Sequence, residues 1–167
     1  DEGFILQRDG LFGDERQHVS ITKKFTFDKH KSTINVFYDV QNNSDKPLVS
    51  KFGIEFNYSL LAGRDDGRFY EINDEPLEDE EKFLISIGET HNVKTVALVD
   101  LWQGLKLKLT LSEKAVLFRF PIETVSQSGS GLEKNYQAST LVPTWYISID
   151  PGKRWEISLN QFVYEEV

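Results

Sequence analysis

Residues 33–41 read TINVFYDVQ, in which apolar and polar side chains alternate. The even positions are apolar and the odd positions are polar, with Phe37 as the exception. Successive side chains of a β-strand point to opposite faces, so this pattern buries one face and leaves the other to water or a ligand. The segment therefore predicts a strand of an antiparallel sheet.

The same alternation runs through residues 52–60, 105–111, 116–120, 145–150 and 155–160. Residues 19–27 and 94–102 are expected to add further strands. Turn-forming residues separate these segments, at 42–47, 65–67, 103–104, 112–114 and 150–153. Many short strands with such spacing predict a single all-β domain over residues 1–167, an antiparallel two-sheet β-sandwich.

The charge of the chain is concentrated in one segment. The 27 Asp and Glu and the 19 Lys and Arg give a net charge of −8, and residues 64–82 hold −6 of it, from nine acids and three bases. The rest of the chain is close to neutral, which suits an uncharged ligand. No basic block is present to neutralise phosphates, so we expect no nucleic-acid partner.

Other classes of protein are excluded by composition. No apolar run approaches the roughly 18–20 residues that span a bilayer, so we expect no membrane partner. The absence of Cys excludes disulfides and Cys-ligated metals, and leaves the cellular compartment open. Because the sequence begins at Asp1 and contains no Met, we expect it to be a processed or excised part of a longer protein.

Two segments interrupt the strand pattern and are expected to be surface loops, residues 64–82 and residues 123–140. Loops on a rigid sheet are frequent places for binding groups. The acidic segment could hold a structural calcium ion, because Ca²⁺ binds six to eight oxygen ligands. The candidate calcium ligands are Asp65, Asp66, Asn73, Asp74 and Glu75.

Side chains that would mark an enzyme are sparse. His18, His30 and His91 are too scattered for a metal site, and no phosphate-binding loop or serine-nucleophile motif is present. A glycosidase would need two carboxylates at a fixed separation. The candidates for such a pair are Glu55, Asp100, Glu123 and Glu133.

Sugar binding fits the residues better. Sugar rings present apolar C–H faces that stack on Trp and Tyr, and hydroxyl groups that bond to Asp, Asn, Gln, Glu and Arg. Trp102 or Tyr146 is the expected stacking residue, whereas Trp145 and Trp155 are expected in the core. The side chains expected to bond sugar hydroxyls are Glu55, Asn57, Asp100 and Arg119 on the strands, and Glu123, Gln127, Glu133 and Gln137 on the long loop.

Residues 120–128 read FPIETVSQS and are followed by Glu133, Tyr136, Gln137 and Trp145, while residues 52–57 read FGIEFN. Together these segments resemble the C-terminal sandwich domain of family 57 glycoside hydrolases, the α-amylase and 4-α-glucanotransferase type. The resemblance implies a galactose-mutarotase-like sandwich. It also implies that catalysis belongs to a separate (β/α) barrel of the parent chain.

The residues and the resemblance support three hypotheses, in this order. The first is a non-catalytic carbohydrate-binding module for α-1,4-glucans such as starch, glycogen or maltooligosaccharides, attached to a glycoside hydrolase or glucanotransferase. The second is a purely structural sandwich that supports the catalytic barrel, which predicts an exposed apolar patch. The third is a small sugar epimerase or hydrolase, which needs a His–acid pair or two facing carboxylates in one cleft.

Overall fold

This computed structural model describes residues 2–28, 30–129 and 131–165. Most of the alternating segments form strands, but the segment 52–60 is divided between two strands, and the turn predicted at residues 112–114 is wrong because a single strand runs through it. The strands are β1 (Glu2–Phe12), β2 (Gln17–Asp28), β3 (Thr33–Asn42), β4 (Leu48–Gly53), β5 (Phe56–Tyr58), β6 (Arg68–Ile72), β7 (Glu75–Pro76), β8 (Gly88–Asp100), β9 (Leu105–Ser128), β10 (Gly131–Ile149) and β11 (Arg154–Glu165). A 3-10 helix, η1 (Asp79–Lys82), precedes β8. No helix of the described residues is long and apolar enough to cross a membrane.

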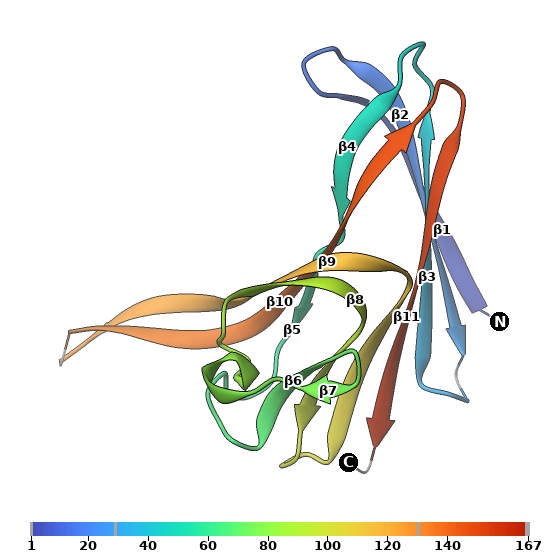
Figure 1. The fold of residues 1–167 in the computed structure, drawn as a ribbon. Helices are drawn as coiled ribbons and strands as arrows, with labels where there is room; N and C mark the ends of the chain where they lie inside the picture. Colours follow the sequence, from blue (N-terminus) through green and yellow to red (C-terminus); the bar gives the residue numbers. More distant parts are fainter. Residues whose placement is uncertain (1, 29, 130, 166–167) are drawn as a thin grey trace.

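The strands pack as two layers, which confirms the predicted antiparallel sandwich (Figure 1). One layer has the order β1-β2-β3-β11-β9-β8-β6-β7, and β10 with β4 and β5 forms the other. Strand β9 belongs to both layers, because residues 105–111 pair with β11 and residues 116–128 pair with β10. This long strand therefore joins the two layers into one sheet that folds over on itself.

The core lies between the layers and is bridged by aromatic side chains. The Tyr38 ring of β3 packs edge-on against Phe52 of β4, with the ring centroids 5.7 Å apart. The Trp155 centroid of β11 lies 5.2 Å from that of Phe52 and 5.8 Å from that of Trp145 on β10. Trp145 is buried and Trp155 packs half-buried against the core, so the prediction that both belong to it is confirmed.

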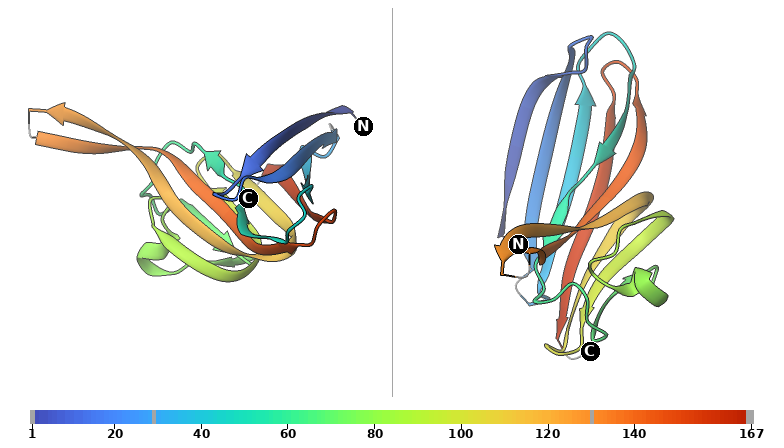
Figure 2. Two further views of the ribbon diagram at one scale, coloured as in Figure 1. Left: turned by 90° about the horizontal axis from the view of Figure 1, so that it is seen from above. Right: turned by 90° about the vertical axis from the view of Figure 1, so that its left-hand side faces the viewer.

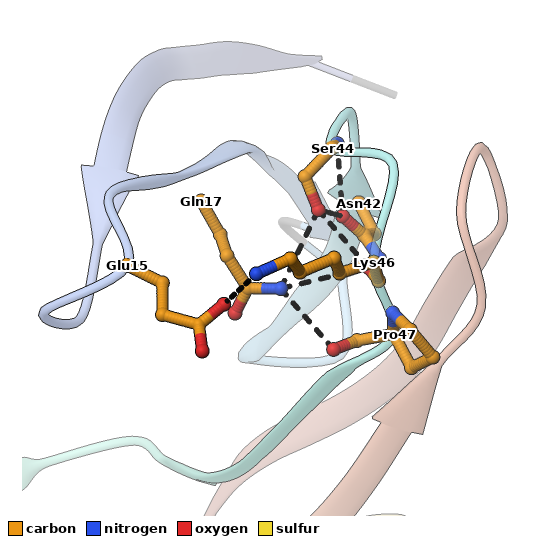
Figure 3. Close-up of polar contacts among 6 residues, drawn as sticks. All are labelled: Glu15, Gln17, Asn42, Ser44, Lys46 and Pro47. Atoms are coloured by element: carbon orange, nitrogen blue, oxygen red, sulfur yellow. Dashed lines mark hydrogen bonds and ion pairs between the residues drawn. The ribbon is translucent and has the colours of Figure 1, made fainter.

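Asn42 ties the ends of the two layers together, and Figure 3 shows its bonds to Ser44 and Lys46. Its side chain is fully buried, and its Nδ2 donates to the backbone oxygens of Lys46 at 2.7 Å and of Ile149 at 2.8 Å. Its Oδ1 accepts from the backbone N–H and the hydroxyl of Ser44, at 3.0 and 2.6 Å. The turn predicted at residues 42–47 is therefore a hydrogen-bonded joint between β3, β4 and the end of β10.

The prediction of a surface loop at residues 123–140 is wrong, because β9 and β10 continue through this segment as a paired ribbon. Figure 2 (left) shows this projecting hairpin, residues 120–129 and 131–140, reaching away from the two layers. Apolar side chains such as Ile122, Val125 and Leu132 are exposed on it. A two-stranded ribbon in water has no buried face, so its sequence lacks the alternation that marks other strands.

The acidic segment at residues 64–82 is not a single loop either. It contains β6, β7 and η1, and β6 pairs with β8. Tyr70 and Ile72 of β6 are buried in the core. Five residues are too short a strand for the alternation to stand out among the surrounding acids.

Candidate functional site

Trp102 lies in the turn between β8 and β9 and is 73% exposed. The turn is fixed by Asp100, whose Oδ1 accepts the backbone N–H of Trp102 at 3.0 Å and of Gln103 at 3.1 Å. Gly104 completes it with a φ of 64°, a conformation that costs glycine little. The local sequence therefore places the indole ring at the surface.

A second turn, residues 65–67, holds the Trp102 ring in place. The indole Nε1 donates to Asp65 Oδ1 at 2.7 Å, and the same oxygen accepts the backbone N–H of Gly67 at 2.8 Å. The hydrogen bond from Trp102 has the larger effect and that from Gly67 the smaller, and together they hold the pKa of Asp65 below its usual value of 3.8. A Cβ on Gly67 would lie 2.5 Å from Nε1, so glycine is required for this close approach. An exposed, immobilised ring is a surface on which the C–H face of a sugar can stack.

Asp100 is not available to a sugar, and its predicted role as a ligand is wrong. The residue has no exposed surface, and its Oδ2 accepts from Arg68 Nε at 2.8 Å while Oδ1 holds the turn. The Arg68 side chain is itself only 9% exposed. Asp100 therefore positions Trp102 and neutralises a buried guanidinium.

Arg119 of β9 is also buried, so its predicted sugar contact is wrong. Its guanidinium donates to Glu81 Oε2 at 2.7 Å, Ser86 Oγ at 3.2 Å and Thr90 Oγ1 at 3.3 Å. A Cβ on Gly88 would lie 2.4 Å from its Nη1. Arg119 thus ties η1 and the segment after it to β8 and β9.

Tyr146 of β10 is 74% exposed and borders a hollow of about 300 Å³. His91 and Trp155 line the same hollow. The ammonium of Lys51 lies 4.9 Å from the centroid of the Tyr146 ring. Tyr146 is therefore a second exposed aromatic surface, and it stands on β10, whereas Trp102 stands in the turn between β8 and β9.

Several of the predicted polar residues gather at the base of the projecting hairpin. Asn57 Nδ2 donates to Glu55 Oε1 at 2.8 Å, and Asn57 Oδ1 accepts from Thr140 Oγ1 at 2.7 Å. Gln137 Nε2 donates to Thr124 Oγ1 across the hairpin at 3.2 Å. Both Glu55 and Asn57 are exposed, and they stand at the β5 edge of the second layer.

The remaining predicted sugar ligands lie farther out on the projecting hairpin. Glu123 pairs with Lys134, with 3.3 Å between Oε2 and Nζ. Gln127 and Glu133 are exposed near the end of the ribbon. The predicted ligands are therefore spread over several surfaces and do not line one cleft.

The residues predicted to bind calcium have separate partners. Asp65 bonds to Trp102, Asp66 to Lys82, Asn73 to the backbone N–H of Lys94, and Asp74 to Lys108. Within residues 2–28, 30–129 and 131–165, no group of three or more His, Asp or Glu could hold a metal ion. A calcium ion stays a prediction for which these residues offer no ligand cluster.

The histidines lie on separate parts of the fold. His18 stands near the start of β2, and His30 in the turn that follows β2. His91 pairs with Glu89 on the exposed surface of β8, with 3.0 Å between Nε2 and Oε1. The candidate carboxylates are likewise dispersed: Glu55 precedes β5, Asp100 is buried at the end of β8, and Glu123 and Glu133 stand on the projecting hairpin.

Comparison of the sequence with known proteins identifies relatives over nearly the whole chain. Residues 1–159 match the model of the family described as "Alpha-amylase/4-alpha-glucanotransferase, C-terminal". The chain is 30% identical over 155 residues to alpha-amylase 1 of Dictyoglomus thermophilum, an alignment that covers 92% of this chain and 21% of that protein. The chain therefore spans about a fifth of the length of this curated relative.

Solved structures share the fold. The 4-alpha-glucanotransferase from Thermococcus litoralis superposes with a TM-score of 0.68 at 20% identity, covering 96% of this chain and 21% of that one. A putative aldose 1-epimerase from Escherichia coli K12 gives a TM-score of 0.69 at 13% identity, covering 99% of this chain and 66% of that one. A galactose mutarotase related enzyme from Lactobacillus acidophilus gives 0.63 at 10% identity, with 98% and 69% covered. The expected galactose-mutarotase-like architecture is confirmed, and at these identities the likeness concerns the fold alone.

Proposed function

This chain belongs to the family of α-amylase/4-α-glucanotransferase C-terminal domains, and from that premise we propose that it is a non-catalytic accessory domain that binds α-1,4-glucan beside a catalytic domain of the same polypeptide. The observation that carries the proposal is the exposed ring of Trp102, held rigid by Asp65. Starch, glycogen and maltooligosaccharides are the expected ligands. Catalysis is assigned to the rest of the parent polypeptide.

The geometry around Trp102 suits a weak, repeating ligand. A ring that is already immobilised loses little conformational freedom when a sugar stacks on it. Sites of this kind gain useful affinity from being linked to another site on the same ligand, because the linkage raises the effective concentration. A polysaccharide chain that also enters a catalytic cleft would supply that second contact.

Replacing the Trp102 ring tests the proposed contact. Trp102→Ala is expected to weaken the binding of maltoheptaose about tenfold or more, because the apolar face that leaves water on stacking is removed. Trp102→Phe keeps an aromatic face and should retain more of the affinity. Isothermal titration calorimetry of the three proteins gives the dissociation constants.

Gly67→Ala is the matched control for ring position. A Cβ at residue 67 would lie 2.5 Å from the indole Nε1, so the ring must move although it is still present. We expect an affinity between those of the unmodified chain and Trp102→Ala. Equal dissociation constants for all the variants would remove Trp102 from the proposed site.

A second role, bracing the catalytic domain, is favoured by an uncovered apolar face on β1 and β2. On the inner side of the layer, this uncovered face carries Phe4, Leu6, Ile21, Phe25 and Phe27, together with Lys23, whose ammonium lies 4.6 Å from the centroid of the Phe25 ring. Phe4 and Phe25 stack with their centroids 4.6 Å apart. Exposure increases from the core toward the edge of the sheet along this face. Val36 of β3 is 4% exposed, its neighbour Phe25 of β2 is half-buried, and Phe4 of β1 beyond it is 47% exposed.

The second layer does not reach this face. Its aromatic contacts with the first layer are made to β3 and β11, through Tyr38 and Trp155. Partly exposed apolar residues gathered on one face in this way mark a docking surface in soluble proteins. We assign it to the catalytic part of the parent polypeptide, because this chain spans only about a fifth of its curated relative.

Opposite faces of β1 allow a matched test of docking. Leu6 lies on the uncovered face at 54% exposure, and Ile5 lies on the other face at 62%. In the parent polypeptide, Leu6→Asp is expected to weaken the domain contact by about 2 kcal/mol, because a charge would be buried in the interface. Ile5→Asp should stay within about 0.5 kcal/mol. Calorimetric unfolding of the parent polypeptide measures both, and equal effects would contradict docking through this face.

A further inference from the structure

A hollow of about 490 Å³ lies on the outer face of β2, β3, β11 and β9, away from the core. We call it the outer groove. The side chains that line it include Lys24, Asn35, Phe37, Thr110, Ser158 and Asn160. Most of them are polar, and Phe37 is the aromatic residue that breaks the alternation of β3.

A row of amide and hydroxyl side chains crosses the outer groove. Asn35 of β3 is paired with Thr26 of β2 on one side and with Asn160 of β11 on the other. Asn160 is paired in turn with Thr110 of β9. Neighbouring strands are about 4.8 Å apart, so the row presents hydrogen-bonding groups at close and regular spacing.

Aromatic rings flank this row on both sides along the strands. Phe37 stands two residues from Asn35, and its neighbours Val36 and Tyr38 are buried in the core, which directs Phe37 to the outer face. Phe162 stands two residues from Asn160 on the same outer face of β11, beyond the lining of the groove, and borders a neighbouring hollow with Tyr164. The rows of Phe37 and Phe162 are therefore about 13 Å apart, which matches a short oligosaccharide.

The second aromatic position is reinforced by Tyr164. The centroids of the Phe162 and Tyr164 rings lie 4.1 Å apart, and Tyr164 is 41% exposed. The three rings on this face are thus not scattered singly, as isolated surface apolar residues usually are. Phe37 and Phe162 stand on opposite sides of the polar row, so aromatic faces and hydrogen-bonding groups follow one another along the strands, as sugar rings and their hydroxyls require.

The amide pair has bonding capacity left for a ligand. Asn160 Nδ2 donates to Asn35 Oδ1 at 2.7 Å. An amide has two N–H donors and an acceptor oxygen, so Asn35 Nδ2 and Asn160 Oδ1 remain without a partner in the described part of the chain. A donor and an acceptor side by side match the hydroxyl groups of a sugar. Lys24 is the charged residue of the lining, and its ammonium offers a further hydrogen-bond donor to a sugar hydroxyl.

We propose that the outer groove, together with the outer face of β11 that continues from it to Phe162, is a second oligosaccharide site, in which Phe37 and Phe162 stack on sugar rings while Asn35 and Asn160 bond to the hydroxyls between them. The choice of α-1,4-glucan as its ligand rests on the proposed function. The site itself rests on the outer-face arrangement of these four side chains and does not involve Trp102.

Nuclear magnetic resonance of the ¹⁵N-labelled chain tests the groove, because each site carries its own reporter. The side-chain amides of Asn35 and Asn160 report on the outer groove, and the indole N–H of Trp102 reports on the turn. Titration with maltoheptaose is expected to shift both sets of signals saturably. Phe37→Ala should raise the dissociation constant at the groove about tenfold and leave the Trp102 response unchanged.

The outcomes separate this inference from the proposed function. Saturable shifts at Trp102 alone overturn the outer groove and leave the proposed function standing. If maltoheptaose shifts the Asn35 and Asn160 signals and Phe37→Ala weakens these shifts, the groove is upheld. If Phe37→Ala leaves these shifts unchanged, the groove is overturned. No shift at either site overturns both proposals.

Two further variants guard the test. Phe120→Ala removes another exposed aromatic ring, on β9 outside the groove, and should leave the groove affinity unchanged. If Phe37→Ala proves unfolded by circular dichroism, Asn160→Ala replaces it, since it removes a hydrogen-bonding side chain that is only half-buried. If maltoheptaose shifts the side-chain amide signals of Asn35 as strongly in that variant as in the unmodified chain, the groove is overturned as well.

Discussion

Asp100→Ala is expected to lower the free energy of unfolding by about 3–5 kcal/mol, because it leaves a buried guanidinium without its partner. Asp100 has no exposed surface, and Arg68 Nε donates to its Oδ2 at 2.8 Å. The substitution also removes the acceptor for the backbone N–H groups of Trp102 and Gln103. Asp65 Oδ2 also pairs with Arg68, at 3.6 Å from Nη1, but it replaces neither the shorter bond to Nε nor the acceptor of the two N–H groups of the turn.

Asp100→Asn is the control that separates charge from turn geometry. An amide oxygen can still accept the two N–H groups of the turn, but the charge opposite Arg68 is lost. We expect a smaller loss, about 1–3 kcal/mol. Urea denaturation followed by circular dichroism measures both variants. A loss below about 1 kcal/mol for Asp100→Ala would show that the buried pair does not hold the turn.

Trp145→Ala is the other large effect, with an expected loss of about 3–5 kcal/mol. Trp145 is 6% exposed and stands at the contact between the layers, where its ring meets that of Trp155. The truncation leaves a cavity at the point where β10 packs on β11. Guanidinium denaturation should show a lower midpoint without a change in the slope.

Trp145→Phe distinguishes loss of volume from loss of a hydrogen bond. The buried Nε1 of Trp145 has no hydrogen-bond partner within the described residues, so replacing the indole removes an unsatisfied donor along with some volume. We expect a loss of only about 1–2 kcal/mol. A loss as large as that of the alanine variant would mean that the indole N–H is bonded in solution.

The sandwich could be predicted from the sequence wherever a strand has one buried face. Val36 and Val40 lie in the core as the pattern of residues 33–41 requires, and the two-layer architecture follows from several such strands. The projecting hairpin could not be predicted, because a ribbon exposed on both faces has no need for alternation. Its strands are fixed by the register between β9 and β10, and a composition rich in Ser, Gly and Gln does not show that register.

The exposed aromatic residues of the candidate site could also be predicted from the sequence. Trp102 stands next to a turn signal, and Tyr146 stands on the polar side of its strand, and both are exposed. The burial of Asp100 and Arg119 could not be predicted, because it depends on partners that are far away in the sequence, Arg68 and Glu81. A charged residue on a strand reveals its partner only when the neighbouring strand is known.

The position of Phe37 could be seen in the sequence, but the alternating pattern alone does not explain why an aromatic residue stands there. An aromatic residue at an otherwise polar position of β3 shows that the outer face is not uniformly in contact with water. Its meaning depends on Asn160 and Phe162, which the register of β11 brings beside β3 from the far end of the chain. Only the strand order of the sheet places these residues together.

A calorimetric titration of this chain with maltoheptaose tests glucan binding most directly. We expect saturable binding with a dissociation constant in the millimolar range or below, as for an accessory domain that relies on linkage to a second site. A titration that shows no saturable heat at millimolar ligand, with the chain folded by circular dichroism, would contradict the claim that it binds α-1,4-glucan.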